Sequence, residues 1–274
     1  MAETDQQSTA KTALVVVAEL VKAAAATEEV RQAGKNVGEA AVTITKLVNN
    51  ALLPIAAVNY GFDKARAYFA DKFASELEEA LAGVPEDRLG MPKVAIAGPA
   101  LQGIAYCVEE PDLKDLYLKL LVSSIDRNSS FDTHPAFVHV ISQLDAQEVR
   151  LLTGVLTRTS PLSLIAIWLS SGDGWNIELN HVGHLSAPDG SPIVVPRLAA
   201  FVDNWIRLGL VVVSYDNQVA GTDAYAWVEE RPEVMRLRAE AARLSKVIRI
   251  QRGMMQRTAF GASFSAAVGA SRWA

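Results

Sequence analysis

The segment from Asn59 to Leu81 carries the pattern that most restricts what this chain can fold into. Apolar side chains recur there at steps of three or four residues: Phe62, Ala65, Phe69, Phe73, Leu77 and Leu81. This spacing lines them up along one side of an α-helix, which turns once every ~3.6 residues. Charged residues occupy most of the positions between them. We therefore expect an amphipathic helix whose apolar side lies in the core, with Phe69 and Phe73 buried.

Helical patterns extend over most of the remaining chain. The alanine-rich residues 11–48 predict one or two further helices, and Pro111 is well placed to begin another. We divide the chain into four regions: N-terminal helices (1–83), a helical block (84–144), a winged-helix-like unit (145–230), and a basic C-terminal helix with a tail (231–274). With 274 residues, half of them hydrophobic, the chain is long enough to bury a sizeable core.

Residues 145–230 follow the element order of a winged helix. Asp145 and Glu148 form a capping-box pattern that begins the first helix. The expected elements are helices over 145–156, Leu162–Leu169 and 196–208, then the β-rich runs Leu210–Tyr215 and Ala224–Val228 as a small hairpin. Between them, residues 171–196 are rich in Gly, Ser, Pro, Asp and Asn, which predicts a long irregular loop.

The last predicted helix runs from about Pro232 to Met255. Its apolar positions repeat at alternating steps of four and three, as in a heptad: Leu237, Ala241, Leu244, Ile248, Gln251 and Met255. This seam must be buried on something, so self-association through the helix is one expectation. The predicted fold class is therefore mainly α: a helical bundle with a winged-helix-like unit, a small β-hairpin and a long C-terminal helix.

Basic residues gather in this C-terminal segment. Residues 231–257 contain eight basic and two acidic side chains, in a protein of net charge −5. The candidate interaction surface comprises Arg236, Arg243, Lys246, Arg249 and Arg252. A solvated helix face, or pairing with the acidic segment 109–115, would explain the same charges. Arg197 and Arg207, on the expected recognition helix, are weaker candidates for nucleic-acid contact because Asp203 lies between them.

The sequence contains no pattern typical of a catalytic, cofactor or metal site. It has no phosphate-binding P-loop, no dinucleotide-binding glycine motif and no nucleophile elbow. The single cysteine, Cys107, precedes Glu109 and Glu110, whose charges disfavour a thiolate, so we expect a core residue. His181 and His184 lie in the predicted loop without neighbouring Cys or acidic ligands, which indicates loop hydrogen bonding and not a metal site.

The compartment is expected to be the cytoplasm. One cysteine allows no internal disulfide, and the polar start of the chain does not resemble a signal peptide. The longest apolar runs also fall short of the ~20 residues that span a bilayer. The arginines and the apolar tail leave peripheral membrane contact open.

The middle of the chain resembles the abortive infection alpha family of bacteria. The residues that carry the resemblance are Ala100–Tyr106, Glu109–Leu121, His134–Val138, Gln143–Glu148 and Trp205–Leu210. The resemblance implies a role in phage defence or a related bacterial conflict, and it brings no known active-site residues. We therefore expect a non-enzymatic defence protein that acts through a protein partner or self-association. The alternatives are a nucleic-acid-binding regulator with a winged helix and a membrane-active effector.

Overall fold

The structure is a computed structural model, and it describes residues 43–44, 46–48, 50, 59–129, 133–187 and 189–269. Most of the N-terminal helices expected over 11–48, and the last residues of the tail, lie outside this described part. The chain forms two compact units. Unit 1 comprises Met1–Arg150 with Ser263–Ala274, and unit 2 comprises Leu151–Ala262. Each unit is described by itself below.

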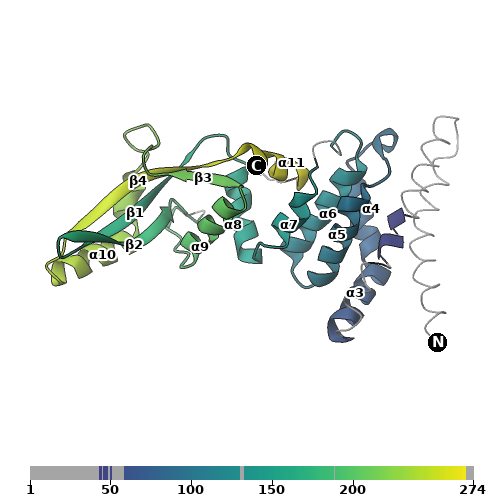
Figure 1. The fold of residues 1–274 in the computed structure, drawn as a ribbon, viewed down its shortest axis with the longest axis horizontal. Helices are drawn as coiled ribbons and strands as arrows, with labels where there is room; N and C mark the ends of the chain where they lie inside the picture. Colours follow the sequence, from purple (N-terminus) through teal and green to yellow (C-terminus); the bar gives the residue numbers. More distant parts are fainter. Residues whose placement is uncertain are drawn as a thin grey trace. The chain divides into compact units, whose positions relative to one another are not determined.

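The described part of unit 1 is helical (Figure 1). Its elements are α3 (Asn59–Asp71), α4 (Phe73–Leu81), the short 3-10 helix η2 (Glu86–Arg88), α5 (Val94–Tyr106), α6 (Pro111–Ile125), α7 (Ala136–Ile141), the first part of α8 (Ala146–Leu156) and the end of α11 (Ala259–Ala267). Two predicted helix starts are confirmed. Pro111 begins α6. The main-chain N–H of Asp145 donates to Glu148 Oε2 at 2.7 Å, as the capping-box pattern predicted.

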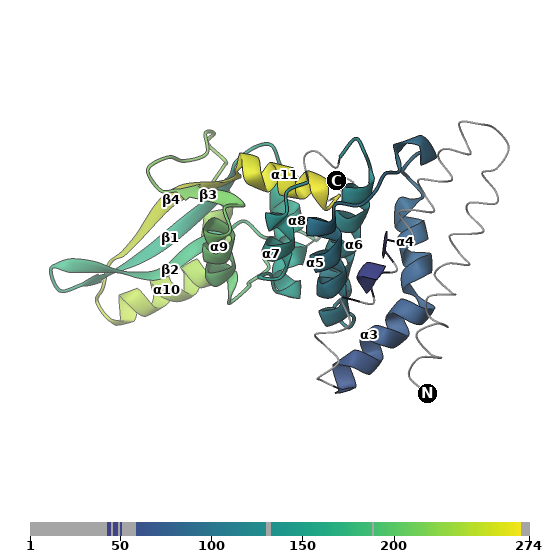
Figure 2. The same ribbon diagram turned by 45° about the vertical axis from the view of Figure 1, so that its right-hand side comes forward.

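The predicted amphipathic stripe packs into the core of unit 1. Phe69 and Phe73 are 5% and 4% exposed, and their rings meet edge to face with centroids 5.0 Å apart. The stripe is shared by two helices, because α3 ends at Asp71 and α4 begins at Phe73. Nearby, α5 and α6 run side by side (Figure 2). Their close approach depends on Gly103, whose missing side chain leaves room for the Tyr117 ring.

Unit 2 is built on a four-stranded antiparallel sheet in the order β2-β1-β4-β3 (Figures 1 and 2). Its strands are β1 (Leu162–Ser171), β2 (Gly174–Gly183), β3 (Val211–Ser214) and β4 (Ile248–Arg257). Its helices are the end of α8, α9 (Leu198–Arg207), the 3-10 helix η3 (Ala226–Glu230) and α10 (Pro232–Arg243). The last strand in sequence, β4, therefore lies between β1 and β3.

This sheet shows that the prediction of a mainly α bundle with a winged-helix-like unit was wrong. The expected helix Leu162–Leu169 is strand β1, and the first part of the expected loop 171–196 contains strand β2. A short apolar run is compatible with either a buried helix or a strand covered on both faces. Here both faces are covered, so β1 lacks the alternation that would have identified it. The second run of the expected hairpin, Ala224–Val228, instead overlaps η3.

The long C-terminal helix was also predicted wrongly. Helix α10 ends at Arg243, Ser245 adopts a positive φ of 53°, and β4 begins at Ile248. Of the expected heptad seam, Leu237 and Ala241 are buried within unit 2, whereas Leu244 is 44% exposed. The seam was a coincidence of spacing between the end of a helix and the start of a strand.

The two faces of the sheet are covered by different elements. On one face, Ile165 and Ile167 join a core with Trp227 of η3 and with Val234 and Leu237 of α10. The opposite face, which carries Leu164, faces α8 and α9 around a small cavity. We call this opposite face the α9 face. It carries the candidate functional features described next.

Candidate functional site

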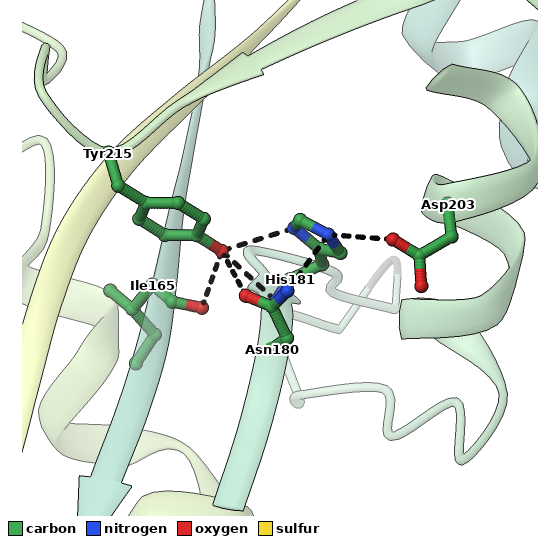
Figure 3. A network of polar contacts seen from close by, with 5 residues as sticks. All are labelled: Ile165, Asn180, His181, Asp203 and Tyr215. Carbon is green, nitrogen blue, oxygen red and sulfur yellow. Dashed lines mark hydrogen bonds and ion pairs between the residues drawn. The ribbon is translucent and has the colours of Figure 1, made fainter. Parts of the chain in front are cut away.

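A network of polar side chains, with the buried His181 at its centre, joins three elements on the α9 face (Figure 3). His181 of β2 is 5% exposed, and its Nε2 lies 3.1 Å from Oδ1 of Asp203 on α9. Its Nδ1 lies 3.1 Å from the hydroxyl of Tyr215, which follows β3. The same hydroxyl donates to Oδ1 of Asn180 at 2.9 Å. Asp203, with 67% of its side chain exposed, is the end of this network that meets solvent.

The network is centred on a bulge in β2. The pairing register shifts between Ile165 and Ile167, so that Asn180 and His181 together lie opposite Ala166. His181 adopts φ of 54°, a left-handed conformation that is uncommon for residues other than glycine. The bulge interrupts the ladder, and Tyr215 compensates: its hydroxyl accepts from the main-chain N–H of His181 at 3.1 Å. Gly253 makes this possible, because a β-carbon there would lie 2.5 Å from the Tyr215 ring.

The surroundings of His181 and Tyr215 keep both side chains uncharged near neutral pH. Burial lowers the pKa of His181, although the Asp203 carboxylate opposes that change. Burial raises the pKa of Tyr215 to about 12. A neutral imidazole that donates from Nε2 to Asp203 leaves Nδ1 as an acceptor, so Nδ1 and Oδ1 of Asn180 compete for the single proton of the Tyr215 hydroxyl. The three side chains then form a chain of hydrogen bonds from the surface to the bulge.

A carboxylate, an imidazole and a hydroxyl in this order also form the catalytic triads of hydrolases. A triad needs a hydroxyl that can reach a substrate. Here the Tyr215 hydroxyl is committed to the bulge, and the cavity lined by His181 measures about 40 Å³. Liquid water occupies about 30 Å³ per molecule, so this cavity has no room for a substrate. The arrangement supports a structural role: it fastens α9 and the segment after β3 to the bulged strand.

A second feature lies at the far end of the α9 face, beyond Tyr215. The register places Trp175, Ser170 and Val247 side by side on β2, β1 and the residue before β4. The next row on the same face contains Ile177, Trp168 and Arg249. We call these six residues the sheet-end patch.

The patch is apolar and open. Trp175 is 41% exposed, Ile177 50% and Val247 61%. Ser170 is small, and the only charged member is Arg249 at one corner. Figure 1 shows the β1–β2 turn and the α10–β4 turn together at this end of the sheet.

The predicted basic surface is partly assembled here. Arg243 ends α10, Lys246 lies in the following turn, and Arg249 lies in the patch. Arg236, also exposed, lies two turns earlier on α10. None of these four side chains has a hydrogen bond or ion pair to another described residue. Arg252 is separated from them, because it pairs with Ile165 on the opposite face and lies over the Tyr225 ring at 5.0 Å.

The remaining predicted basic positions do not form a common surface. Arg197 and Arg207 lie at opposite ends of α9, about 15 Å apart along its axis. The Arg197 guanidinium covers the Phe201 ring, and Arg207 donates to Asn204. The acidic segment 109–115 has ion-pair partners within unit 1: Lys64 for Glu109, Arg150 for Asp112 and Lys119 for Asp115.

His184 and Cys107 are the remaining residues that the sequence singled out. His184 stacks on Trp227 with centroids 5.4 Å apart. Cys107 is half-buried at the end of α5, and burial together with Glu110 raises the pKa of its thiol to about 11. Over the described ranges, no group of three or more His, Cys, Asp or Glu side chains is arranged to hold a metal ion.

Unit 1 contains a larger groove of about 750 Å³ between α4, α6 and the end of α11. Basic side chains that line it already have carboxylate partners: Arg88 with Asp126, Lys114 with Glu76, and Lys119 with Asp115. In these ion pairs, carboxylates of unit 1 itself neutralise the basic side chains that line the groove.

Comparison with known proteins identifies the family. Residues 65–268 match the abortive infection alpha family, which is more than half of the chain. The chain belongs to this family. The resemblance seen in the sequence is therefore confirmed, and it extends through both units. Membership gives the protein an abortive-infection-related role.

The family match stands alone among the comparisons. No curated protein and no solved structure shows significant similarity to the chain. Among the helices that the structure describes, none has the length and apolar character to cross a bilayer.

Proposed function

We propose that this abortive infection alpha protein acts by binding a protein partner through the sheet-end patch, without catalysing a reaction. The exposure of Trp175, Ile177 and Val247 beside the unpaired Arg249 is the observation that carries this proposal. Tryptophan and arginine are enriched among the residues that dominate protein–protein binding energies. Contiguous exposed apolar groups with a polar border are also typical of interaction sites.

The fold of unit 2 does not support the nucleic-acid alternative. That alternative required a winged helix with Arg197 and Arg207 on a recognition helix. Instead, α9 turns Phe201, Val202 and Trp205 into the core of unit 2, and its Asp203 binds His181. Vesicle binding and light scattering distinguish a protein partner from membrane contact and from self-association.

A phage challenge tests the proposed function. Cells expressing the wild type, Trp175→Ser or Arg249→Glu would be compared with cells lacking the gene, over a panel of phages. We expect both variants to lose protection. Both positions are exposed, so the thermal melts should stay close to wild type, with stability changes within about 0.5 kcal/mol.

Two controls make comparable changes elsewhere in unit 2, one from an apolar residue to serine and one from arginine to glutamate. Ile206→Ser alters a side chain that is 39% exposed on α9, and Arg158→Glu alters an exposed arginine before β1. Arg158 precedes the start of β1, whereas the patch lies at its other end, about 30 Å away along the strand. Both controls should protect as the wild type does. Full protection by Trp175→Ser and Arg249→Glu would contradict the proposal. We also propose a cytoplasmic location, which fractionation of a tagged protein tests.

A further inference from the structure

The charges that border the sheet-end patch indicate the chemistry of its partner. Basic side chains lie along the β4 side: Arg249 in the patch, Lys246 in the turn and Arg243 at the end of α10. Exposed acidic residues lie along the β2 side: Asp173 in the β1–β2 turn, and Glu178, which a second register shift in β2 places with Ile177 opposite Trp168. The apolar centre is therefore bordered by positive charge on one side and negative charge on the other.

This two-sided border distinguishes between classes of partner. An anionic bilayer or a nucleic-acid duplex presents negative charge everywhere, so it would attract Arg249 and Lys246 but repel Asp173 and Glu178. The turn that would enter a bilayer first is Gly172-Asp173-Gly174, which carries a carboxylate and no apolar side chain. A protein surface can place opposite charges a few ångströms apart and so complement both borders.

The apolar centre sets a second requirement. Trp175 and Val247 stand on either side of Ser170, and cross-strand neighbours are about 5 Å apart. Ser170, whose Oγ accepts from the main-chain N–H of Val247, is thus the smallest side chain of this row. An apolar side chain of the partner would lie over Ser170 and displace water from Trp175 and Val247.

We propose that the sheet-end patch binds a protein segment that places apolar side chains over Ser170, carboxylates against Arg249 and Lys246, and basic side chains against Asp173 and Glu178. This inference rests on the proposed function and names the chemistry of the partner. The contact with Arg249 is the central one, because it lies in the patch itself, next to the partly buried Trp168. A guanidinium can bind a carboxylate through two parallel hydrogen bonds.

The test uses the full chain and defined probes. The first probe, the glutamate peptide, is a short synthetic amphipathic peptide with leucines along one side, glutamates on one flank of the leucines and lysines on the other flank. The second is the same peptide with every glutamate replaced by lysine. The third is vesicles of equal parts phosphatidylglycerol and phosphatidylcholine, and the fourth is duplex DNA. Binding would be measured by fluorescence anisotropy for the peptides and DNA, and by sedimentation for the vesicles.

We expect the glutamate peptide to bind and the lysine peptide not to bind. Arg249→Glu and Trp175→Ser should each weaken binding by about tenfold or more, equivalent to about 1.4 kcal/mol. Arg158→Glu and Ile206→Ser should leave it unchanged. Higher salt should weaken binding of the glutamate peptide, since its charges are exposed.

Several results would overturn the proposal. These are binding of vesicles or DNA that depends on Arg249, and binding of neither peptide. A concentration-dependent rise in mass by light scattering that Trp175→Ser abolishes would assign the patch to a second copy of the chain. If phage protection still depends on Trp175 while the glutamate peptide fails to bind, the proposed function stands and the chemistry named here is wrong.

Discussion

Gly103 on α5 lies directly against the ring of Tyr117 on α6, and a β-carbon at Gly103 would overlap that ring. Tyr117 is 2% exposed, so its ring has no free space to move into. The glycine therefore sets the distance between two helices of the unit 1 core.

Gly103→Ala should destabilise the protein even though alanine is the better helix former. Overpacking of a core costs about 1–3 kcal/mol, more than the ~0.5–1 kcal/mol gained by replacing a helical glycine. Gly154 in α8 is the matched control, because nothing lies within 4 Å of a β-carbon there. Gly154→Ala should raise stability. Chemical denaturation checks both, and equal behaviour of the two variants would show that the α5–α6 contact is looser than described.

Tyr215→Phe removes the hydroxyl that completes the bulge in β2. The main-chain N–H of His181 then loses its acceptor, and a buried donor left unsatisfied costs about 1–3 kcal/mol. Amide hydrogen exchange at His181 should also become faster. Tyr106→Phe, at a side chain that is 60% exposed, is the control and should change stability little. If Tyr215→Phe melts like the wild type, the hydroxyl does not hold the bulge.

The low pKa of His181 gives stability a defined dependence on pH. Because burial lowers the pKa of the folded His181, the unfolded chain takes up this proton more readily than the folded chain does. This contribution is constant above the unfolded pKa of about 6.5 and is lost as the pH falls below it. His181→Asn should remove this component, since asparagine tolerates the positive φ found here. Denaturation at pH 5 to 8 tests it, and an unchanged slope in the variant would exclude His181 as the source.

Arg231 fastens the segment between β2 and α9. The side chain is buried, and its guanidinium donates to the carbonyls of Leu185 and Ile193, each at 3.1 Å, and to Glu233. Arg231→Met should cost about 3–5 kcal/mol, because it leaves Glu233 without its partner in a buried setting. Limited proteolysis should then cut between Leu185 and Ile193.

Arg238 provides the comparison for Arg231. It pairs with Glu229, but both side chains are largely exposed, so Arg238→Met should cost about 0–1 kcal/mol. Similar losses in the two variants would mean that the bonds of Arg231 to the segment contribute little.

The helices of unit 1 were predictable because their signals are local. The stripe through Phe69 and Phe73 and the capping pair Asp145 and Glu148 each lie within a few turns of one segment, and the structure contains both. Of the strands described in unit 2, β3 was predicted as the run Leu210–Tyr215, whereas β1, β2 and β4 were not predicted. Residues 164–167 of β1 are buried on both faces and so lack alternation. In β2, Trp175, Ile177 and Leu179 do alternate with polar residues, so that strand signal was present in the sequence. In β4, Ile248 and Ile250 do alternate with Arg249 and Gln251, which was the available strand signal.

The buried network could not be anticipated from local patterns. It joins His181, Asp203 and Tyr215, which belong to three separate elements and meet only when the sheet forms. The sheet-end patch depends on register in the same way. Its apolar members are Trp175 and Ile177 on β2, Trp168 on β1 and Val247 before β4, and the sequence alone does not place them on one face. The basic residues were visible, but the sequence did not show that Arg249 and Arg252 point to opposite faces.

The position of β4 has a consequence for synthesis on the ribosome. Because β4 lies between β1 and β3, the hairpin of β1 and β2 emerges with one edge of β1 unpaired until residues 248–257 have been made. Unit 1 is also incomplete until residues 264–267 have been made, since Phe264 packs on Phe137 and Ser123 donates to the carbonyl of Ala267. A nascent chain halted before Ile248 therefore completes neither unit. Such a chain exposes an open strand edge at β1 in place of the completed sheet.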